Sequence, residues 1–258
     1  MRAEGGAGVT PLVTLRGVDK SFKSGTVALQ NVDLDIRDGE FLSLLGPSGC
    51  GKSTVLRIVA GLTTISGGHV QWRGQPSLGF VFQEPTLAPW SDVFDNVWLP
   101  LRLKGVSRRD ARAPVEEALV NVGLTGFERA YPRELSGGMK MRVSIARALV
   151  LKPAVLLMDE PFAALDEITR AKLNDDLLSL RANLRTTIVF VTHSVYESVY
   201  LSTRICVMAP RPGRVVAEIA IDPSVVRDEE FRLGHYYADR AREASAALHE
   251  AMGASKCA

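Results

Sequence analysis

The sequence has few cysteines, no excess of one charge and no long apolar run. Its three cysteines, Cys50, Cys206 and Cys257, are too widely spaced for a metal-ligand cluster and cannot all pair, as is typical of a reducing compartment. Lys and Arg number 31 against 29 Asp and Glu, a formal net charge of +2, which excludes a broad basic surface. We therefore expect no nucleic-acid partner.

Two further absences concern membranes. The longest apolar runs, such as 154–158 and 188–191, fall far short of the roughly 20 residues that span a bilayer. Residues 1–8 are small and polar and lack the apolar stretch of a secretion signal. With 46% hydrophobic residues in a chain of 258, the composition is that of a globular protein. We expect a cytoplasmic protein that does not cross a membrane alone.

The first part of the chain predicts strands followed by a helix. Residues 12–36 alternate apolar and polar side chains, which predicts a small antiparallel β layer. Residues 40–45 are mainly apolar, as in a buried strand. The glycine-containing loop 46–51 then leads into helical spacing over 52–60, which Gly61 ends. The order is strand, loop, helix.

The remaining pattern predicts an α/β protein. Three apolar runs, 78–82, 154–158 and 187–192, fit strands of a parallel sheet covered on both faces. Residues 92–150 show helical patterns without a strand, and residues 227–252 are charged and helical. We expect the tail to be a packed helix; a regulatory role is the alternative. We expect one domain with a core and its β layer at 12–86 and 150–222, a helical subdomain at 87–149 and a C-terminal helical tail at 223–258.

Eight consecutive residues fit the phosphate-binding pattern G-x-x-x-x-G-K-[ST]: Gly46, Pro47, Ser48, Gly49, Cys50, Gly51, Lys52 and Ser53. Small residues let the backbone curl so that several N–H groups face a phosphate, and the helix N-terminus adds positive potential. Lys52 would reach the β- and γ-phosphates of ATP, Ser53 would ligate Mg²⁺, and Thr54 would add a hydroxyl. A glycine turn that only caps a helix is the alternative.

Cys50 lies inside the loop, so we expect a thiol reagent to inhibit the protein and ATP to protect it.

A second motif supplies two carboxylates. The apolar run 155–158 ends at Asp159 and Glu160, an arrangement that carries one carboxylate to Mg²⁺ and the next to the attacking water. Many buried strands end in an acidic residue that only caps a turn, so the pair is a weak signal alone. The phosphate loop in the same chain favours the functional interpretation.

A third motif names a family. Leu135, Ser136, Gly137, Gly138 and Met139 open a helical stretch, with Ser136 as the N-cap and the glycine amides free to meet an anion. Taken alone, this is a capping signal. Between the phosphate loop and the pair of carboxylates it resembles the signature motif, usually LSGGQ, of ATP-binding cassette (ABC) ATPases.

The resemblance covers nearly all of residues 12–221 and includes three single residues. Gln83 matches the family's Q-loop, Asp166 its D-loop and His193 its switch histidine. Each has another explanation when taken alone: a solvated loop residue, a helix cap and a packed histidine. The motifs occur in the family's order, which makes the combination specific.

The resemblance implies a P-loop NTPase (RecA-like) core that binds two ATP molecules between two subunits. Each ATP would lie between the phosphate loop of one subunit and the signature motif of the other. A second ATPase chain is therefore expected, most simply as a homodimer. Glu160 would polarise the water and His193 would contact the γ-phosphate. Gln83 would join Ser53 and Asp159 at the Mg²⁺.

Three positions vary the family pattern. Phe22 lies where the family places an aromatic ring, commonly Tyr, that stacks on adenine; packing within the β layer is the alternative. Met139 replaces the usual Gln and removes a polar group near the opposite nucleotide. Ser194 follows His193 where Asp is frequent. These look like subfamily differences.

A narrower resemblance concerns transport. Residues 81–85 (Val-Phe-Gln-Glu-Pro), 88–90 (Ala-Pro-Trp) and 211–214 (Arg-Pro-Gly-Arg), with Met139, look like the nitrate, sulfonate and taurine group of importer ATPases. The resemblance implies a bacterial importer. Its ATPase chains would lie at the cytoplasmic face of the inner membrane, under an integral membrane permease, with an extracytoplasmic substrate-binding protein outside.

The permease contact and the cargo follow only from that resemblance. We hypothesise that the apolar cluster Leu87, Pro89, Trp90 and Val93 lines the groove for a permease coupling helix; internal packing is the alternative. Small organic anions are the group's usual cargo, although 192–198 resembles relatives dedicated to pyrimidine-type precursors. A soluble ABC ATPase without a transport role and a P-loop kinase or switch GTPase are the other function classes.

Overall fold

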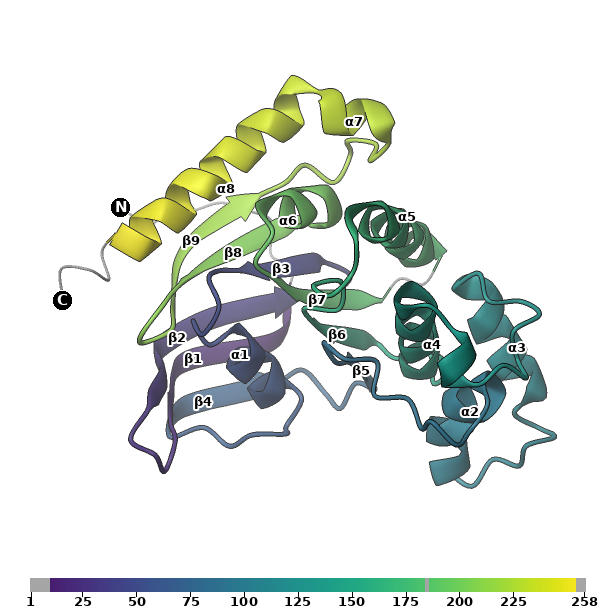
Figure 1. Cartoon of the computed structure of the whole chain (residues 1–258). Coiled ribbons are helices and arrows are strands. Elements are labelled where there is room, and N and C mark those ends of the chain that lie inside the picture. Colours follow the sequence, from purple (N-terminus) through teal and green to yellow (C-terminus); the bar gives the residue numbers. More distant parts are fainter. Residues whose placement is uncertain (1–9, 184–185, 254–258) are drawn as a thin grey trace.

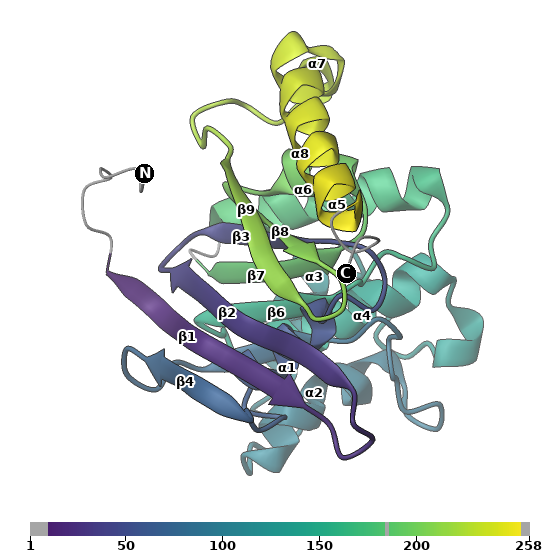
Figure 2. The same cartoon turned by 90° about the vertical axis from the view of Figure 1, so that its left-hand side faces the viewer.

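Two β-sheets form the centre of the molecule. The computed structural model describes residues 10–183 and 186–253, shown in Figures 1 and 2. The larger sheet has the strand order β5-β6-β7-β3-β8-β9, and the smaller sheet has the order β2-β1-β4. The larger sheet consists of β3 (Phe41–Leu45), β5 (Leu78–Val81), β6 (Val155–Asp159), β7 (Thr187–Thr192), β8 (Arg204–Ala209) and β9 (Arg214–Ala220). The smaller sheet consists of β1 (Pro11–Ser21), β2 (Val27–Arg37) and β4 (Gly67–Trp72).

The larger sheet is parallel except at one edge. β3, β5, β6, β7 and β8 pair in parallel, and β9 pairs antiparallel to β8. β3, β6, β7 and β8 are buried along their whole lengths, because helices and the smaller sheet cover both faces. The four strands expected from apolar runs are confirmed within one residue at each end. Their carboxyl ends meet at one edge, where polar residues follow each strand.

The smaller sheet is the expected antiparallel layer. β1 pairs with β2 on one side and β4 on the other. Buried side chains such as Leu15, Val18 and Leu34 pack in one cluster with Val55 and Leu56 of α1 (Lys52–Val59). The sequence did not predict β4, which starts with two glycines and has no buried residue along its length. β8 and β9 were not predicted either.

Helices make up the segment between β5 and β6. α2 (Val93–Leu103), α3 (Arg112–Asn121), the 3₁₀ turn η1 (Pro132–Glu134) and α4 (Gly137–Leu149) lie together at the end of the molecule away from the smaller sheet (Figure 1). Asp92 begins α2, because its carboxylate accepts from the Asp95 N–H at 2.7 Å. No strand lies among the described residues 92–150, as expected.

The C-terminal helices cover the sheet edge formed by β8 and β9. α5 (Glu167–Asn183), α6 (Val195–Leu201), α7 (Glu229–Leu233) and α8 (His235–Gly253) follow in order. Phe231 is 6% exposed and packs against the rings of Tyr200, Tyr236 and Tyr237. The tail is therefore packed on the domain through α6 and β8 (Figure 2). Cys257 lies outside the described residues, and no described helix is long and apolar enough to cross a membrane.

A buried arginine joins the two sheets. Arg204, at the start of β8, is 7% exposed in its side chain and lies 2.8 Å from the Glu40 carboxylate, which is 8% exposed. The same guanidinium donates to the Asp35 carbonyl of β2 and lies 2.9 Å from Glu218 of β9. A buried charge is tolerated only when it is paired, so this network constrains how β2, β3, β8 and β9 pack.

We expect Arg204→Met to lower the free energy of unfolding by about 3–5 kcal/mol, because the Glu40 carboxylate stays buried without its partner. Urea denaturation followed by circular dichroism measures the change. The matched control is Arg73→Met, which breaks the exposed pair between Arg73 and Asp38 and should cost no more than about 1 kcal/mol. Equal losses for the two variants would contradict a structural role for the buried network.

Candidate active site

The loop between β3 and α1 can be built only with glycine at two positions. A Cβ atom on Gly46 would lie 2.6 Å from Cys50 Sγ, and one on Gly51 would lie 2.5 Å from the Leu29 side chain. Gly51 also has a φ of +92°, which residues with a Cβ rarely adopt. No side chain caps the start of α1. The first amides of this helix are therefore available to an anion.

Lys52 lies folded across this loop. Its Nζ donates to the carbonyl oxygens of Gly46 at 2.7 Å and Pro47 at 3.0 Å, and lies 3.3 Å from Glu160 Oε1. The side chain is only 3% exposed. A buried ammonium with these three oxygen partners can move to a phosphate without being left unpaired on the way.

Ser53 and Asp159 form the second pair of the site. Ser53 Oγ donates to Asp159 Oδ1 at 2.6 Å, across the gap between α1 and the end of β6. Burial raises the pKa of Asp159, and the hydrogen bond from Ser53 opposes that shift. A hydroxyl and a carboxylate are hard oxygen ligands that suit Mg²⁺. In the described part of the chain no three His, Cys, Asp or Glu residues gather into a metal site, so Mg²⁺ here would also need phosphate oxygens.

Glu160 and His193 meet at the same edge of the sheet. His193 Nδ1 lies 3.1 Å from Glu160 Oε2, and the His193 side chain is 51% exposed, which excludes the packed-histidine alternative. Glu160 has a φ of +45°, and its N–H donates to the Val191 carbonyl at 3.0 Å. A left-handed backbone at a residue other than glycine costs energy and is common at functional sites. Ser194 caps α6 through the Glu197 N–H.

A pocket of about 530 Å³ lies between the phosphate loop and Glu160. It is lined by Thr26, Val27, Ala28, Ser48, Gly49, Gly51, Lys52, Ser53, Thr54, Gln83, Glu160 and Arg211. The phosphate loop, Gln83 and Glu160 are thus brought together as the sequence predicts. Thr26–Ala28 and Arg211 were not predicted, because they come from the ends of two hairpins that only the fold places beside the loop. The described lining includes no signature residue and not Asp166.

The signature motif and Asp166 lie next to each other instead. Ser136 Oγ accepts from the Met139 N–H at 3.3 Å and caps α4, as the sequence predicts. A Cβ on Gly138 would lie 2.6 Å from the Thr169 side chain, so glycine is needed there. Asp166 accepts from the Thr169 N–H at 2.9 Å, and this hydrogen bond lowers its pKa. Asp166 therefore caps the first turn of α5, which begins at the next residue.

Gln83 is exposed on the segment after β5, and an arginine of α4 holds that segment. The Arg147 guanidinium donates to the carbonyl oxygens of Pro85 at 2.8 Å and Thr86 at 2.9 Å, and to the Thr86 hydroxyl at 3.0 Å. Sequence reasoning missed Arg147, because an arginine within an amphipathic helix is usually a solvated charge.

The structure settles two local alternatives. Phe22 is 44% exposed, with Lys20 Nζ 5.1 Å from its ring centroid, so it is not a core residue of the β layer. Cys50 is fully buried in the apolar cluster behind the loop. Burial raises the pKa of its thiol, against the effect of Lys52. The buried sulfur disfavours the inhibition by a thiol reagent that the position of Cys50 in the loop predicts.

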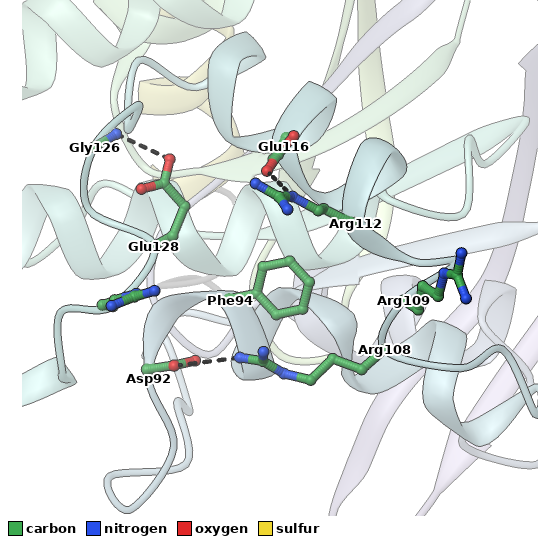
Figure 3. A pocket seen from close by; sticks show the side chains of 9 residues that line it. Asp92, Phe94, Arg108, Arg109, Arg112, Glu116, Gly126 and Glu128 are labelled. Carbon is green, nitrogen blue, oxygen red and sulfur yellow. Dashed lines mark hydrogen bonds and ion pairs between the residues drawn. The ribbon is translucent and has the colours of Figure 1, made fainter.

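A second pocket, of about 590 Å³, is lined by residues between Asp92 and Arg129 (Figure 3). It does not include the phosphate loop or Glu160. Arg108 lies 2.9 Å from the Asp95 carboxylate and 3.6 Å from that of Asp92, and its guanidinium stacks on Phe94. Arg112 pairs with Glu116 at 2.8 Å. Since nearby carboxylates already pair two of the arginines, we assign nucleotide binding to the phosphate-loop pocket.

Comparison with known proteins agrees with this geometry. The family model for ABC transporters matches residues 29–163. The chain belongs to the ABC transporter family. An aliphatic sulfonates import ATP-binding protein of Pseudomonas syringae is 48% identical over 219 residues, 84% of this chain and 89% of that protein. A taurine import ATP-binding protein of Rhizobium johnstonii is 47% identical over 201 residues, 76% of this chain and 77% of that protein.

Solved structures show the same fold. A dimeric ATP-binding cassette in a post-hydrolysis state, bound to ADP and phosphate, matches with a TM-score of 0.73 and 35% identity, covering 81% of this chain and 99% of that one. The cbiO1 chain of Clostridium perfringens, part of the ABC transporter complex cbiONQ, matches with a TM-score of 0.73 and 28% identity, covering 81% of this chain and 88% of that one. The chain is thus an ABC-type ATPase with a P-loop NTPase core, a β layer and an inserted set of helices.

We expect Cys50 to react with a small thiol reagent at least about 100-fold more slowly in the native chain than in urea, because its sulfur is buried and its pKa is raised. Peptide mass spectrometry after timed alkylation measures the rate for this residue alone. Fast labelling that ATP prevents would instead show that the thiol faces the nucleotide.

Proposed function

We propose that this chain is the ATP-hydrolysing subunit of an importer for a small organic anion such as a sulfonate. The observation that carries the proposal is the pocket lined by the phosphate loop, Ser53 and Glu160, in which Ser53 is hydrogen-bonded to Asp159. The import role and the cargo class are supported by relatives named for sulfonate and taurine import at 47–48% identity.

The phosphate loop would bind the triphosphate. The backbone N–H groups of residues 48–51 and of the start of α1 would surround the phosphates, and the Lys52 ammonium would leave its carbonyl partners for the β- and γ-phosphates. Ser53, Asp159 and Gln83 would hold Mg²⁺; Ser53 and Gln83 both line the pocket. Bound there, Mg²⁺ would neutralise charge on the phosphates.

Glu160 would act on the attacking water. Its carboxylate lies 3.3 Å from Lys52 Nζ and 3.1 Å from His193 Nδ1, so these two side chains orient it. When Lys52 turns to the phosphates, one oxygen of Glu160 is released to accept a hydrogen bond from water. His193, which is half exposed, would then contact the γ-phosphate and keep Glu160 in place.

A second copy of the chain would complete each site. Leu135, Ser136, Gly137, Gly138 and Met139 do not line the pocket of their own chain. We propose that they contact the ATP of the partner subunit, through the backbone amides at 137 and 138 and the Ser136 hydroxyl, with Asp166 beside them. The similarity to a dimeric cassette supports this arrangement. Phe22, exposed at the end of β1, would stack on adenine.

The permease would dock near Trp90. Of the four apolar residues expected to line this groove, Val93 is fully buried and Leu87 packs against the core, so the expectation is wrong for these two. Pro89 is exposed, and Trp90 is 81% exposed. An exposed tryptophan is typical of an interface residue.

The turn that carries Trp90 is rigid. Asn96, 1% exposed, donates to the carbonyl oxygens of Ala88 and Ser91 and accepts from the Ala88 N–H at 2.8 Å. A preformed turn loses little entropy on binding. We propose that it contacts an integral membrane permease at the cytoplasmic face of the membrane, with an extracytoplasmic binding protein delivering the solute. The parts at 12–86 with 150–222, at 87–149 and at 223–258 would act as core, coupling subdomain and packed tail.

Glu160→Gln should bind ATP with nearly unchanged affinity but hydrolyse it at least about 100-fold more slowly, because it keeps the phosphate cradle and removes the carboxylate. Size-exclusion chromatography should then show an ATP-dependent dimer. In the control Lys52→Ala, ATP binding itself should weaken. Normal turnover by Glu160→Gln, or a monomer at saturating ATP, would contradict the proposed roles.

Trp90→Ala should leave dimerisation and basal ATP hydrolysis of the isolated chain unchanged while reducing co-purification with the permease and cellular uptake of taurine by about tenfold or more. The matched control is Leu233→Ala, which removes a side chain of similar exposure from α7 and should change neither. Intact uptake by Trp90→Ala would place the permease contact elsewhere. Recovery of no permease with the wild-type chain would favour a soluble ABC ATPase.

A further inference from the structure

The Arg211-Pro212-Gly213-Arg214 segment has no part in the roles described so far. It forms the loop between β8 and β9, and Figure 2 shows the turn between these strands beside β2. Arg211 has a φ of +45°, a left-handed conformation that an arginine rarely adopts. Such a conformation persists only where the surroundings fix it, and it is common at ligand sites.

Gly213 fixes the loop against the nucleotide pocket. Its N–H donates to the Ala28 carbonyl at 3.0 Å, and its carbonyl accepts from the Gln30 N–H at 3.0 Å. A Cβ on Gly213 would lie 2.2 Å from the Cys50 carbonyl oxygen and 2.8 Å from that of Ala28. The loop therefore touches both the phosphate loop and the start of β2, and only glycine permits this approach.

Arg211, two residues earlier, lines the nucleotide pocket. Among the described residues that line it, only Lys52 and Arg211 carry a cationic side chain. Lys52 already has three oxygen partners, whereas Arg211 is exposed and has no hydrogen-bond or ion-pair partner within residues 10–183 and 186–253. A cation with no protein partner at the wall of a phosphate pocket is available to the ligand.

The position of Arg211 in the pocket indicates which part of the nucleotide it would contact. Lys52 and Glu160 contact each other, so they mark the end where the β- and γ-phosphates would lie. The Arg211 loop is instead attached to Ala28, on the hairpin side of the pocket. A guanidinium binds phosphate through two parallel N–H donors, which a lone ammonium cannot do.

We propose that the Arg211 guanidinium binds the α-phosphate of the nucleotide and so contributes to the affinity for ADP and ATP alike. This assignment rests on the proposed nucleotide site. Because the α-phosphate does not react, the contact is the same before and during hydrolysis. Arg211 is a nucleotide-binding residue and takes no part in the chemical step.

The test compares dissociation constants for ADP and, in the Glu160→Gln background, for ATP. Arg211→Ala should raise both by about the same factor, on the order of tenfold. Arg211→Lys should lose less affinity, since it keeps the positive charge but not the two parallel N–H donors. The matched control is Arg214→Ala, an exposed arginine of the same segment that does not line the pocket, and it should bind normally. In the wild-type background, Arg211→Ala should raise KM for ATP and leave kcat unchanged.

Unchanged dissociation constants, a loss confined to ATP, or a lower kcat with unchanged KM would each overturn the assignment. Thermal unfolding without nucleotide checks that Arg211→Ala folds as the wild type does; if it does not, Arg211→Lys against Arg214→Lys gives the same comparison. Lys52→Ala separates the two hypotheses. If it also fails to weaken binding, the proposed nucleotide site is wrong, whereas weakened binding by Lys52→Ala alone overturns only the role of Arg211.

Discussion

Close backbone contact around the phosphate loop is the constraint on which the rest of the site depends. Three segments, the loop itself, the start of β2 and the β8–β9 turn, approach one another so tightly that Gly46, Gly51 and Gly213 have no room for a Cβ. Because each segment belongs to a different part of the two sheets, the loop is held from behind by the whole core. The cradle for the phosphates is therefore formed before a nucleotide binds, and little ordering is required on binding.

The charged groups at the phosphate loop pair with one another. Lys52 is bonded to loop carbonyls and Glu160, Asp159 to Ser53, and Glu160 also to His193. A buried charge without a partner would be costly, so this set of contacts stabilises the site. In the proposed mechanism, ATP would exchange one set of partners for another. The free energy of binding would then be a difference between two satisfied states.

Much of this architecture could be predicted from residue pattern. The strands β3, β5, β6 and β7 were found within one residue, because strands buried on both faces are continuously apolar. β4, β8 and β9 were missed; β4 has two glycines and no buried residue, and β9 buries only one of its seven residues. Their pairing depends on neighbours distant in sequence, which a local pattern does not contain.

Some residues of the site could likewise be predicted from the sequence, and others could not. The motif at 46–53 specifies a backbone path, so the loop was placed correctly, but the direction of the Cys50 side chain was not. Its sulfur packs in the core. Arg211 and Thr26–Ala28 reach the pocket only through the hydrogen bonds of Gly213 to β2. Such partners become visible once the topology is known, because no spacing in the sequence relates them.

Helix α4 connects the parts of the proposed mechanism. Its first turn, capped by Ser136, carries the signature residues that would contact the partner's nucleotide. Its last turns carry Arg147, which donates to the carbonyl oxygens of Pro85 and Thr86, two and three residues after Gln83. The next residues of that segment lead to the turn of Trp90, which Asn96 holds. A helix moves as a unit, so any shift of α4 on closing over a partner's ATP would displace the Gln83 segment with it. The same hydrogen bonds would therefore link closure of the proposed two-chain site to the surface proposed for the permease.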